Sequence, residues 1–165
     1  MNAPNPSSRS EPRAEVTLES LLLPGHHDRL ELIGDQLAIE ASQGSSADLQ
    51  QMWASFVREF DEHLAIEESV LLPQFTVSNP TEARALLEEH AELRRHRDLT
   101  QRELALQRPR LPELQAFLHL LRQHSHREDR VLYAWAARQL THEQLHEVRA
   151  RIKALMGIGQ APGST

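Results

Sequence analysis

The hydrophobic and polar residues of this chain follow the 3.6-residue period of α-helices, and no segment shows convincing strand alternation. Breakers rich in Gly, Pro, Ser or Asn interrupt the period between the helical segments. We expect four long helices at about 24–42, 47–72, 80–107 and 112–139, and a short fifth helix at about 141–156. Long helices with short connections predict an all-α fold, an antiparallel up-down-up-down four-helix bundle with a short fifth C-terminal helix.

Local residue patterns predict how some of these helices begin and end. Pro73 is expected to close the second helix. Asn79 is expected to cap the third helix, with Glu82 completing a capping-box-like arrangement. Thr141 and Gln144 have the same spacing and predict a capping box at the start of the fifth helix.

The two ends of the chain differ in composition from the helical part. Residues 1–15 are rich in Pro, Ser and Asn, which predicts a disordered N-terminal tail. Residues 157–165 predict a flexible C-terminal tail. Residues 16–156 are then expected to form a single domain, and this length is enough for a hydrophobic core.

Ionisable residues interrupt the apolar stripe of two helices. His63 and Glu67 fall within the stripe of the second helix, and His124 and Glu128 within that of the fourth. In both helices the histidine and the glutamate are four residues apart, so they share one face of the helix. A buried carboxylate without a partner costs several kcal/mol. The repeated pattern therefore indicates a compensating group inside the core.

Histidines also lie on the inner side of the other two helices. His90 falls within the stripe of the third helix, whereas His26 and His27 lie near the borders of the first, and periodicity does not choose between them. Imidazoles and carboxylates directed into one core favour a bound cation, and this donor set suits iron, manganese or zinc. Two carboxylates that face each other in a helical bundle can bridge two metal ions.

Four segments of the chain resemble the hemerythrin-like HHE cation-binding domain family. They are "HHDRLELIGDQL", "EHLAIEESVLLP", "EHAELRR" and "QHSHREDRVLY", in the family's order over about residues 20–136. The resemblance implies an oxo- or hydroxo-bridged pair of iron ions, one bound through each pair of histidines and both bridged by the glutamates. The implied ligands are His27, His63, Glu67, His90, His124 and Glu128, with His26 and Asp129 as alternatives to His27 and Glu128.

One departure from the oxygen-carrying hemerythrins shapes the functional expectation. Those proteins have a second histidine four residues after the ligand of the third helix, and this chain has Arg94 there. Both irons would keep an open position, which favours reaction with hydrogen peroxide, nitric oxide or dioxygen, a role in oxidative stress and an unidentified electron donor. The alternatives are a non-catalytic oxygen- or iron-binding carrier or sensor, and a metal-free helical interaction protein.

Composition excludes several other classes of function. The chain has no cysteine, which excludes thiolate metal sites, and a net charge of −6, which gives no basic field for nucleic acid or membrane partners. No apolar run approaches the length of a membrane span and the N-terminus lacks a signal-peptide core, so a cytoplasmic location is expected. The zincin-like "HEQLH" places His142 and His146 away from the inner stripe, which disfavours a zinc protease.

Overall fold

The computed structural model describes residues 23–43, 46–106 and 111–155, and within these ranges it is helical without strands. The predicted all-α class is therefore confirmed for this part of the chain. Both predicted tails, 1–15 and 157–165, lie outside the described residues. The helices are α1 (Leu23–Gln43), α2 (Ser46–Ile66), α3 (Leu72–Ser78), α4 (Pro80–Ala105), α5 (Leu111–Glu128), α6 (Ala134–Gln139) and α7 (His142–Leu155).

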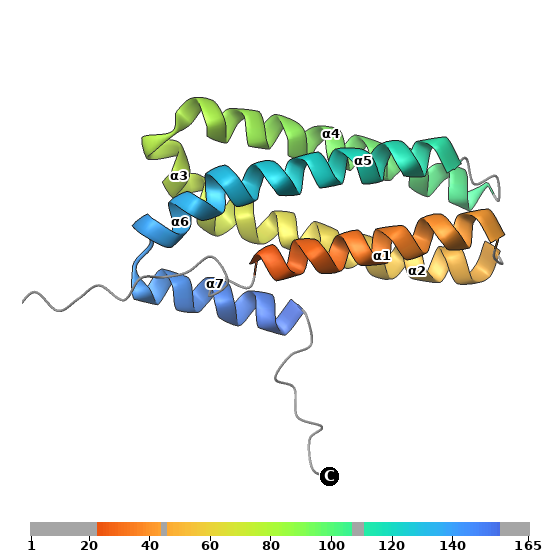
Figure 1. Cartoon of the computed structure of the whole chain (residues 1–165), viewed down its shortest axis with the longest axis horizontal. Helices are drawn as coiled ribbons and strands as arrows, with labels where there is room; N and C mark the ends of the chain where they lie inside the picture. Colours follow the sequence, from red (N-terminus) through yellow and green to blue (C-terminus); the bar gives the residue numbers. More distant parts are fainter. Residues whose placement is uncertain (1–22, 44–45, 107–110, 156–165) are drawn as a thin grey trace, which may run out of the picture.

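Four long helices lie lengthwise beside one another. Figure 1 shows α1, α2, α4 and α5 in this arrangement, with the shorter α7 running alongside. Contacts join α1 to α2, α4 to α5 and α1 to α5. At Gly34 of α1 the helix lies tightly against α5, because an added Cβ would lie 2.5 Å from a methyl group of Leu118. Among the described helices, none is long and apolar enough to cross a membrane.

Two π-helical turns join long helices to shorter ones. The first, η2 (Glu67–Leu71), connects α2 to α3, and the second, η3 (Asp129–Tyr133), connects α5 to α6. The prediction that Pro73 closes the second helix is wrong, because the chain stays helical to Ser78. A π turn is wider than an α turn, and this one contains Ser69, whose carbonyl would clash with the ring of Pro73 in a regular helix.

The two predicted caps differ in outcome. The capping box of α7 is present, because Thr141 N–H donates to Gln144 Oε1 over 2.9 Å and Gln144 N–H donates to Thr141 Oγ1 over 3.3 Å. The cap of α4 is not formed, since Asn79 lies at the N-cap without a capping hydrogen bond from its side chain. Glu82 instead accepts a hydrogen bond from Arg127, so this carboxylate ties α4 to α5.

Among the residues that the structure describes, the hydrophobic core forms two clusters. One lies where α3, α6 and α7 meet the long helices, and Leu145 and Val148 anchor α7 to it. The other lies toward the α1–α2 and α4–α5 connections and contains stacked and edge-on aromatic rings. The buried histidines and glutamates belong to neither cluster.

Phe117 is the centre of the aromatic cluster and gives a test of this packing. Its ring lies edge-on to those of Trp53, Phe56 and Phe60, with centroid distances of 5.6, 5.7 and 5.6 Å. We expect Phe117→Ala to lower the free energy of unfolding by about 3–5 kcal/mol in urea denaturation, because it opens a cavity in a closed core. Leu87→Ala is the control, since Leu87 is 43% exposed. Equal losses in both variants would contradict the assigned core.

Candidate metal centre

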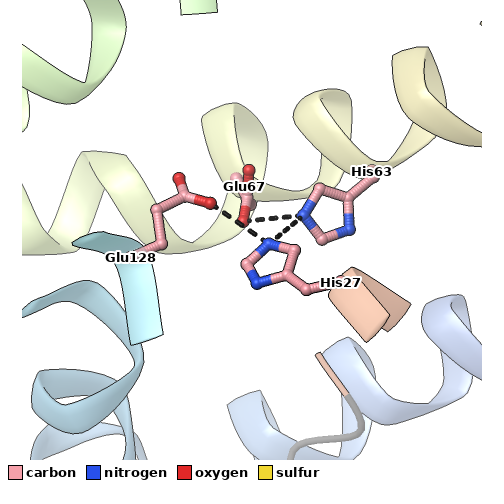
Figure 2. A group of neighbouring side chains, drawn as sticks. All are labelled: His27, His63, Glu67 and Glu128. Carbon is pink, nitrogen blue, oxygen red and sulfur yellow. Dashed lines mark hydrogen bonds and ion pairs between the residues drawn. The ribbon is translucent and has the colours of Figure 1, made fainter. Parts of the chain in front are cut away.

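The structure gathers all six side chains that the sequence analysis singled out. They form two overlapping groups, and the potential ligand atoms within each group lie within 4.8 Å of one another. Figure 2 shows the first group, in which residues from α1, α2, η2 and α5 point toward one another. None of the six is more than 4% exposed. The groups are His27, His63, Glu67 and Glu128, and Glu67, His90, His124 and Glu128.

The two glutamates belong to both groups, and each directs one oxygen into each. Glu67 Oε1 lies 3.1 Å from His63 Nε2, and Glu67 Oε2 lies 3.6 Å from His90 Nε2. Glu128 Oε2 lies 3.3 Å from His27 Nε2, and Glu128 Oε1 lies 3.2 Å from His90 Nε2. A carboxylate that offers separate oxygens to neighbouring groups has the arrangement required to bridge two cations.

Three atoms that face this centre lack a hydrogen bond. Among the described residues, no hydrogen-bond partner reaches the buried atoms Glu67 Oε2, His124 Nε2 and Glu128 Oε2. His124 Nε2 does lie 3.1 Å from Glu128 Oε1, but without the geometry of a hydrogen bond. Native proteins leave few buried polar atoms unsatisfied. Metal ions would satisfy these imidazole and carboxylate donors, so the residues present fit a metal centre.

The outer nitrogen of His90 is held by a carboxylate and an arginine. His90 Nδ1 lies 2.9 Å from Glu68 Oε1, and Arg94 donates to both oxygens of Glu68 over 2.7 and 3.1 Å. Burial alone would raise the pKa of Glu68, but the hydrogen bonds from Arg94 and His90 lower it. Arg94 therefore acts on His90 through Glu68, and this support keeps His90 Nε2 directed at the centre.

His124 has the same kind of support on α4. Its Nδ1 lies 2.8 Å from Glu89 Oε2, and Arg127 donates to the other oxygen of Glu89. Burial favours a raised pKa for Glu89, yet hydrogen bonds from His124 and Arg127 lower it. The ionised carboxylate fixes the ring so that His124 Nε2 faces the two glutamates.

Asp129, the alternative to Glu128, occupies an outer position. Its Oδ1 lies 3.2 Å from Nδ1 of His27, on the side of the ring that points away from the centre. Glu128 is fully buried and belongs to both groups, whereas the side chain of Asp129 is 32% exposed. The structure therefore places Glu128 at the centre and gives Asp129 the role of orienting His27.

His26, the alternative to His27, supports His63 instead. The Nδ1 atoms of His26 and His63 are 2.7 Å apart. Burial, together with the charges of His63, His27 and Arg29, lowers the pKa of His26 to about 2, so its ring is neutral. If His63 Nε2 faces the centre unprotonated, His63 Nδ1–H donates and His26 Nδ1 accepts. His26 Nε2 then faces Glu59 Oε2 at 3.6 Å.

Without a metal ion, charge pairs hold the centre together. Burial opposes protonation of His27, but the hydrogen bond to Asp129 and the negative charge of Glu128 raise the pKa of His27 to about 9. Burial also opposes protonation of His124, but the negative charge of Glu128 and the hydrogen bond to Glu89 raise the pKa of His124 to about 10. Burial would raise the pKa of Glu128, yet His124 and its neighbours hold it well below its usual range.

Tyr133 also reaches this centre, although the helical period of the sequence did not indicate it. Its hydroxyl donates to Glu67 Oε1 and lies 3.2 Å from His27 Nε2 and 3.3 Å from His63 Nε2. In a regular α-helix a residue five positions after Glu128 would point about 140° away from it. The π turn η3 covers these positions and turns Tyr133 inward. Burial and the charge of Glu67 raise the pKa of Tyr133.

The zincin-like segment lies away from this centre. His142 and His146 are both exposed, as expected from the phase of α7. Within the described ranges, neither histidine belongs to a group that could hold a metal ion. The residues that orient His63, His90 and His124 were missed in the sequence, although His26, Glu68 and Glu89 each adjoin a predicted ligand.

Comparison with known proteins agrees with this geometry. The family model for the hemerythrin HHE cation-binding domain matches residues 21–136. Neither the curated proteins nor the solved structures contain a match to this chain. The family match covers more than half of the sequence and includes both groups of buried histidines and glutamates. The chain therefore belongs to the hemerythrin HHE cation-binding domain family.

Proposed function

We propose that this chain is a non-haem di-iron protein that reacts with small oxidants, namely hydrogen peroxide, nitric oxide or dioxygen. His27 and His63 would hold one ion, and His90 and His124 the other. Glu67 and Glu128 would bridge the pair, since each directs one oxygen into each group. We also propose that the four long helices around the site form the antiparallel bundle expected from the sequence.

The main support for a di-iron site is the presence of two groups of metal donors that share both glutamates. Iron fits because the donors are imidazoles and carboxylates, and the chain has no cysteine to favour a softer ion. Bound iron supplies a one-electron change of oxidation state and a position that can exchange small ligands. The protein supplies a buried setting in which outer carboxylates fix the direction of His27, His90 and His124.

Arg94 supports an open position on the second ion. Its guanidinium binds Glu68 and cannot ligate a metal, so α4 provides a single histidine to the centre. The His90 group then offers four protein donors, fewer than the six that a near-octahedral ion accepts. Reduction of dioxygen or nitric oxide at this position would also need an external electron donor.

A cavity between α4 and α5 supports access by a small molecule. It encloses about 230 Å³. Leu93 and Leu120 give it apolar walls, and His124 lines its inner side. A molecule as small as peroxide could approach the ion at His124 by this route, since His124 is the one proposed ligand that lines the cavity. The cavity's remaining lining residues are Glu89, Glu92 and Gln123.

Loss of a bridging carboxylate tests the function directly. We expect the iron-loaded protein to bind two irons per chain and to decompose peroxide. Glu67→Ala should reduce iron content to one or fewer and lower peroxide turnover at least about tenfold, because this side chain serves both ions. Glu62→Ala is the control, since Glu62 lies on the same helix and is exposed. Iron content by elemental analysis and peroxide consumption provide the measurements.

The other outcomes of this experiment separate the alternatives. Two irons with no turnover of peroxide, nitric oxide or dioxygen would favour a carrier or sensor. A wild-type protein that binds no metal under iron-replete conditions would favour a helical interaction protein.

The two neighbouring histidines of α1 should differ in their effect on iron binding. His27→Ala removes a proposed ligand and should lower iron content sharply. His26→Ala removes only the support of His63, so both irons should bind while iron loss to a chelator accelerates by about 10–100-fold. His142→Ala, at an exposed position, should change neither quantity. Equal iron contents in the His26 and His27 variants would contradict the assignment.

Metal binding should displace protons from the centre. Because the pKa values of His27 and His124 are raised to about 9 and about 10, both rings are protonated at neutral pH in the metal-free protein. A metal ion that binds these nitrogens must displace the protons. We expect proton release in calorimetric titrations with ferrous iron in buffers of different ionisation enthalpy, and weaker binding as pH falls. Heats that do not depend on the buffer would contradict this charge state.

The same pKa values predict the stability of the metal-free protein. A raised histidine pKa contributes stability that is complete below the unfolded value of about 6.5. This contribution is lost as pH rises through about 9 and about 10. Urea denaturation of the metal-free protein across this range should show that loss, and the iron-loaded protein serves as the control.

A further inference from the structure

The Tyr133 hydroxyl lies inside the first group of donors. Tyr133 is the chain's single tyrosine and is fully buried. Its oxygen is 3.2 Å from His27 Nε2 and 3.3 Å from His63 Nε2, and it donates to Glu67 Oε1. The phenol therefore contacts the metal-facing atoms of all three residues.

These distances match those between ligands of a single ion. At metal–ligand bonds of about 2.1 Å, adjacent ligands of an octahedral ion lie about 3 Å apart. His27 Nε2 and His63 Nε2 are 3.0 Å apart, and His63 Nε2 is 3.1 Å from Glu67 Oε1. The spacings of the Tyr133 oxygen fall close to this range.

The groups that only orient the histidines lie elsewhere. Asp129 contacts Nδ1 of His27, and His26 contacts Nδ1 of His63, so both act on the outer edge of the ring. Tyr133 contacts the opposite, Nε2 edge of the same two rings. Its position is therefore that of a donor to the ion and differs from that of the surrounding hydrogen-bond partners.

We propose, on the basis of the di-iron function proposed above, that the Tyr133 oxygen is a further protein ligand of the iron held by His27 and His63. It would bind as a phenolate, and the proton that it now donates to Glu67 would leave to solvent as the ion binds. Ligation by Tyr133 raises the protein donors of this ion to five, against four for the ion at His90 and His124. The oxo or hydroxo bridge adds one donor to each ion, so the first ion reaches six and is closed, and the second has five and keeps one open position.

This ligand would make the two ions unequal. The motif that begins at His63 matches the motif that begins at His124, and Leu72 is the position that corresponds to Tyr133. Leu72 is buried and has no donor atom, so the second ion gains no such ligand. Small oxidants would therefore bind at the ion of His90 and His124, next to the cavity that His124 lines. The expectation that both ions are equally open is replaced by one closed and one open ion.

Spectroscopy of the oxidised, iron-loaded protein tests the ligand. We expect a visible phenolate-to-iron charge-transfer band, with tyrosine ring modes enhanced in resonance Raman spectra excited within it. Because the chain has one tyrosine, any such signal belongs to Tyr133. Tyr133→Phe removes only the oxygen and should retain two irons while the band disappears. Trp135→Phe, which changes an aromatic ring packed against Phe75, should leave the band unchanged.

Azide binding tests the inequality of the two ions. We expect the oxidised wild-type protein to bind one azide per pair of irons and Tyr133→Phe to bind two, measured by optical titration. One azide per pair in both proteins would overturn the closure of the first ion.

The outcomes distinguish this inference from the proposed function. Two bound irons with no tyrosine signal in the wild-type protein would overturn the ligand and leave the di-iron function intact. A wild-type protein that binds no iron would overturn both. If Tyr133→Phe does not fold, the Raman spectrum of the wild-type protein alone still decides.

Discussion

Two fully buried carboxylates, Glu67 and Glu128, set the constraint that the surrounding structure satisfies. Their charge cannot be left alone in a core, because an unpaired buried carboxylate costs several kcal/mol. Imidazoles surround them. Glu68 and Glu89 hold two of these imidazoles, and arginines hold both of those carboxylates. From Glu128 this series runs through His124 and Glu89 to Arg127, so the sign of charge alternates from the centre to the half-exposed rim. Binding and folding thus depend on the same contacts.

The α1–α2 and α4–α5 pairs build this arrangement in the same way. The acid directly after each shared glutamate holds a histidine of the other helix pair: Glu68 contacts His90, and Asp129 contacts His27. The residue directly before His27 or His90 holds the second histidine of its own helix pair: His26 contacts His63, and Glu89 contacts His124. Each pair therefore orients one histidine within itself and one in its partner, which couples the packing of all four helices to the direction of the donors.

Helical periodicity was sufficient to predict the inward residues but not their partners. His63, Glu67, His124 and Glu128 were identified because each precedes its π turn or lies at its start, where 100° per residue still gives the side-chain direction. Beyond those turns the phase shifts, so the extension of the second helix past Pro73 and the inward direction of Tyr133 were missed. The choices between His26 and His27 and between Glu128 and Asp129 depended on how these side chains pack against the other helices, and a single sequence does not specify that packing.

The α1–α2 and α4–α5 pairs differ at two positions, and both differences affect the ion proposed at His27 and His63. His63 is supported by the neutral ring of His26, whereas the corresponding His124 is supported by the carboxylate of Glu89. An anionic acceptor makes a ligating imidazole a stronger donor, so the first group lacks one anion behind its histidines. The phenolate proposed for Tyr133 would restore that negative charge from inside the first group. The two ions would then experience similar total charge while only one of them keeps a position for an incoming ligand.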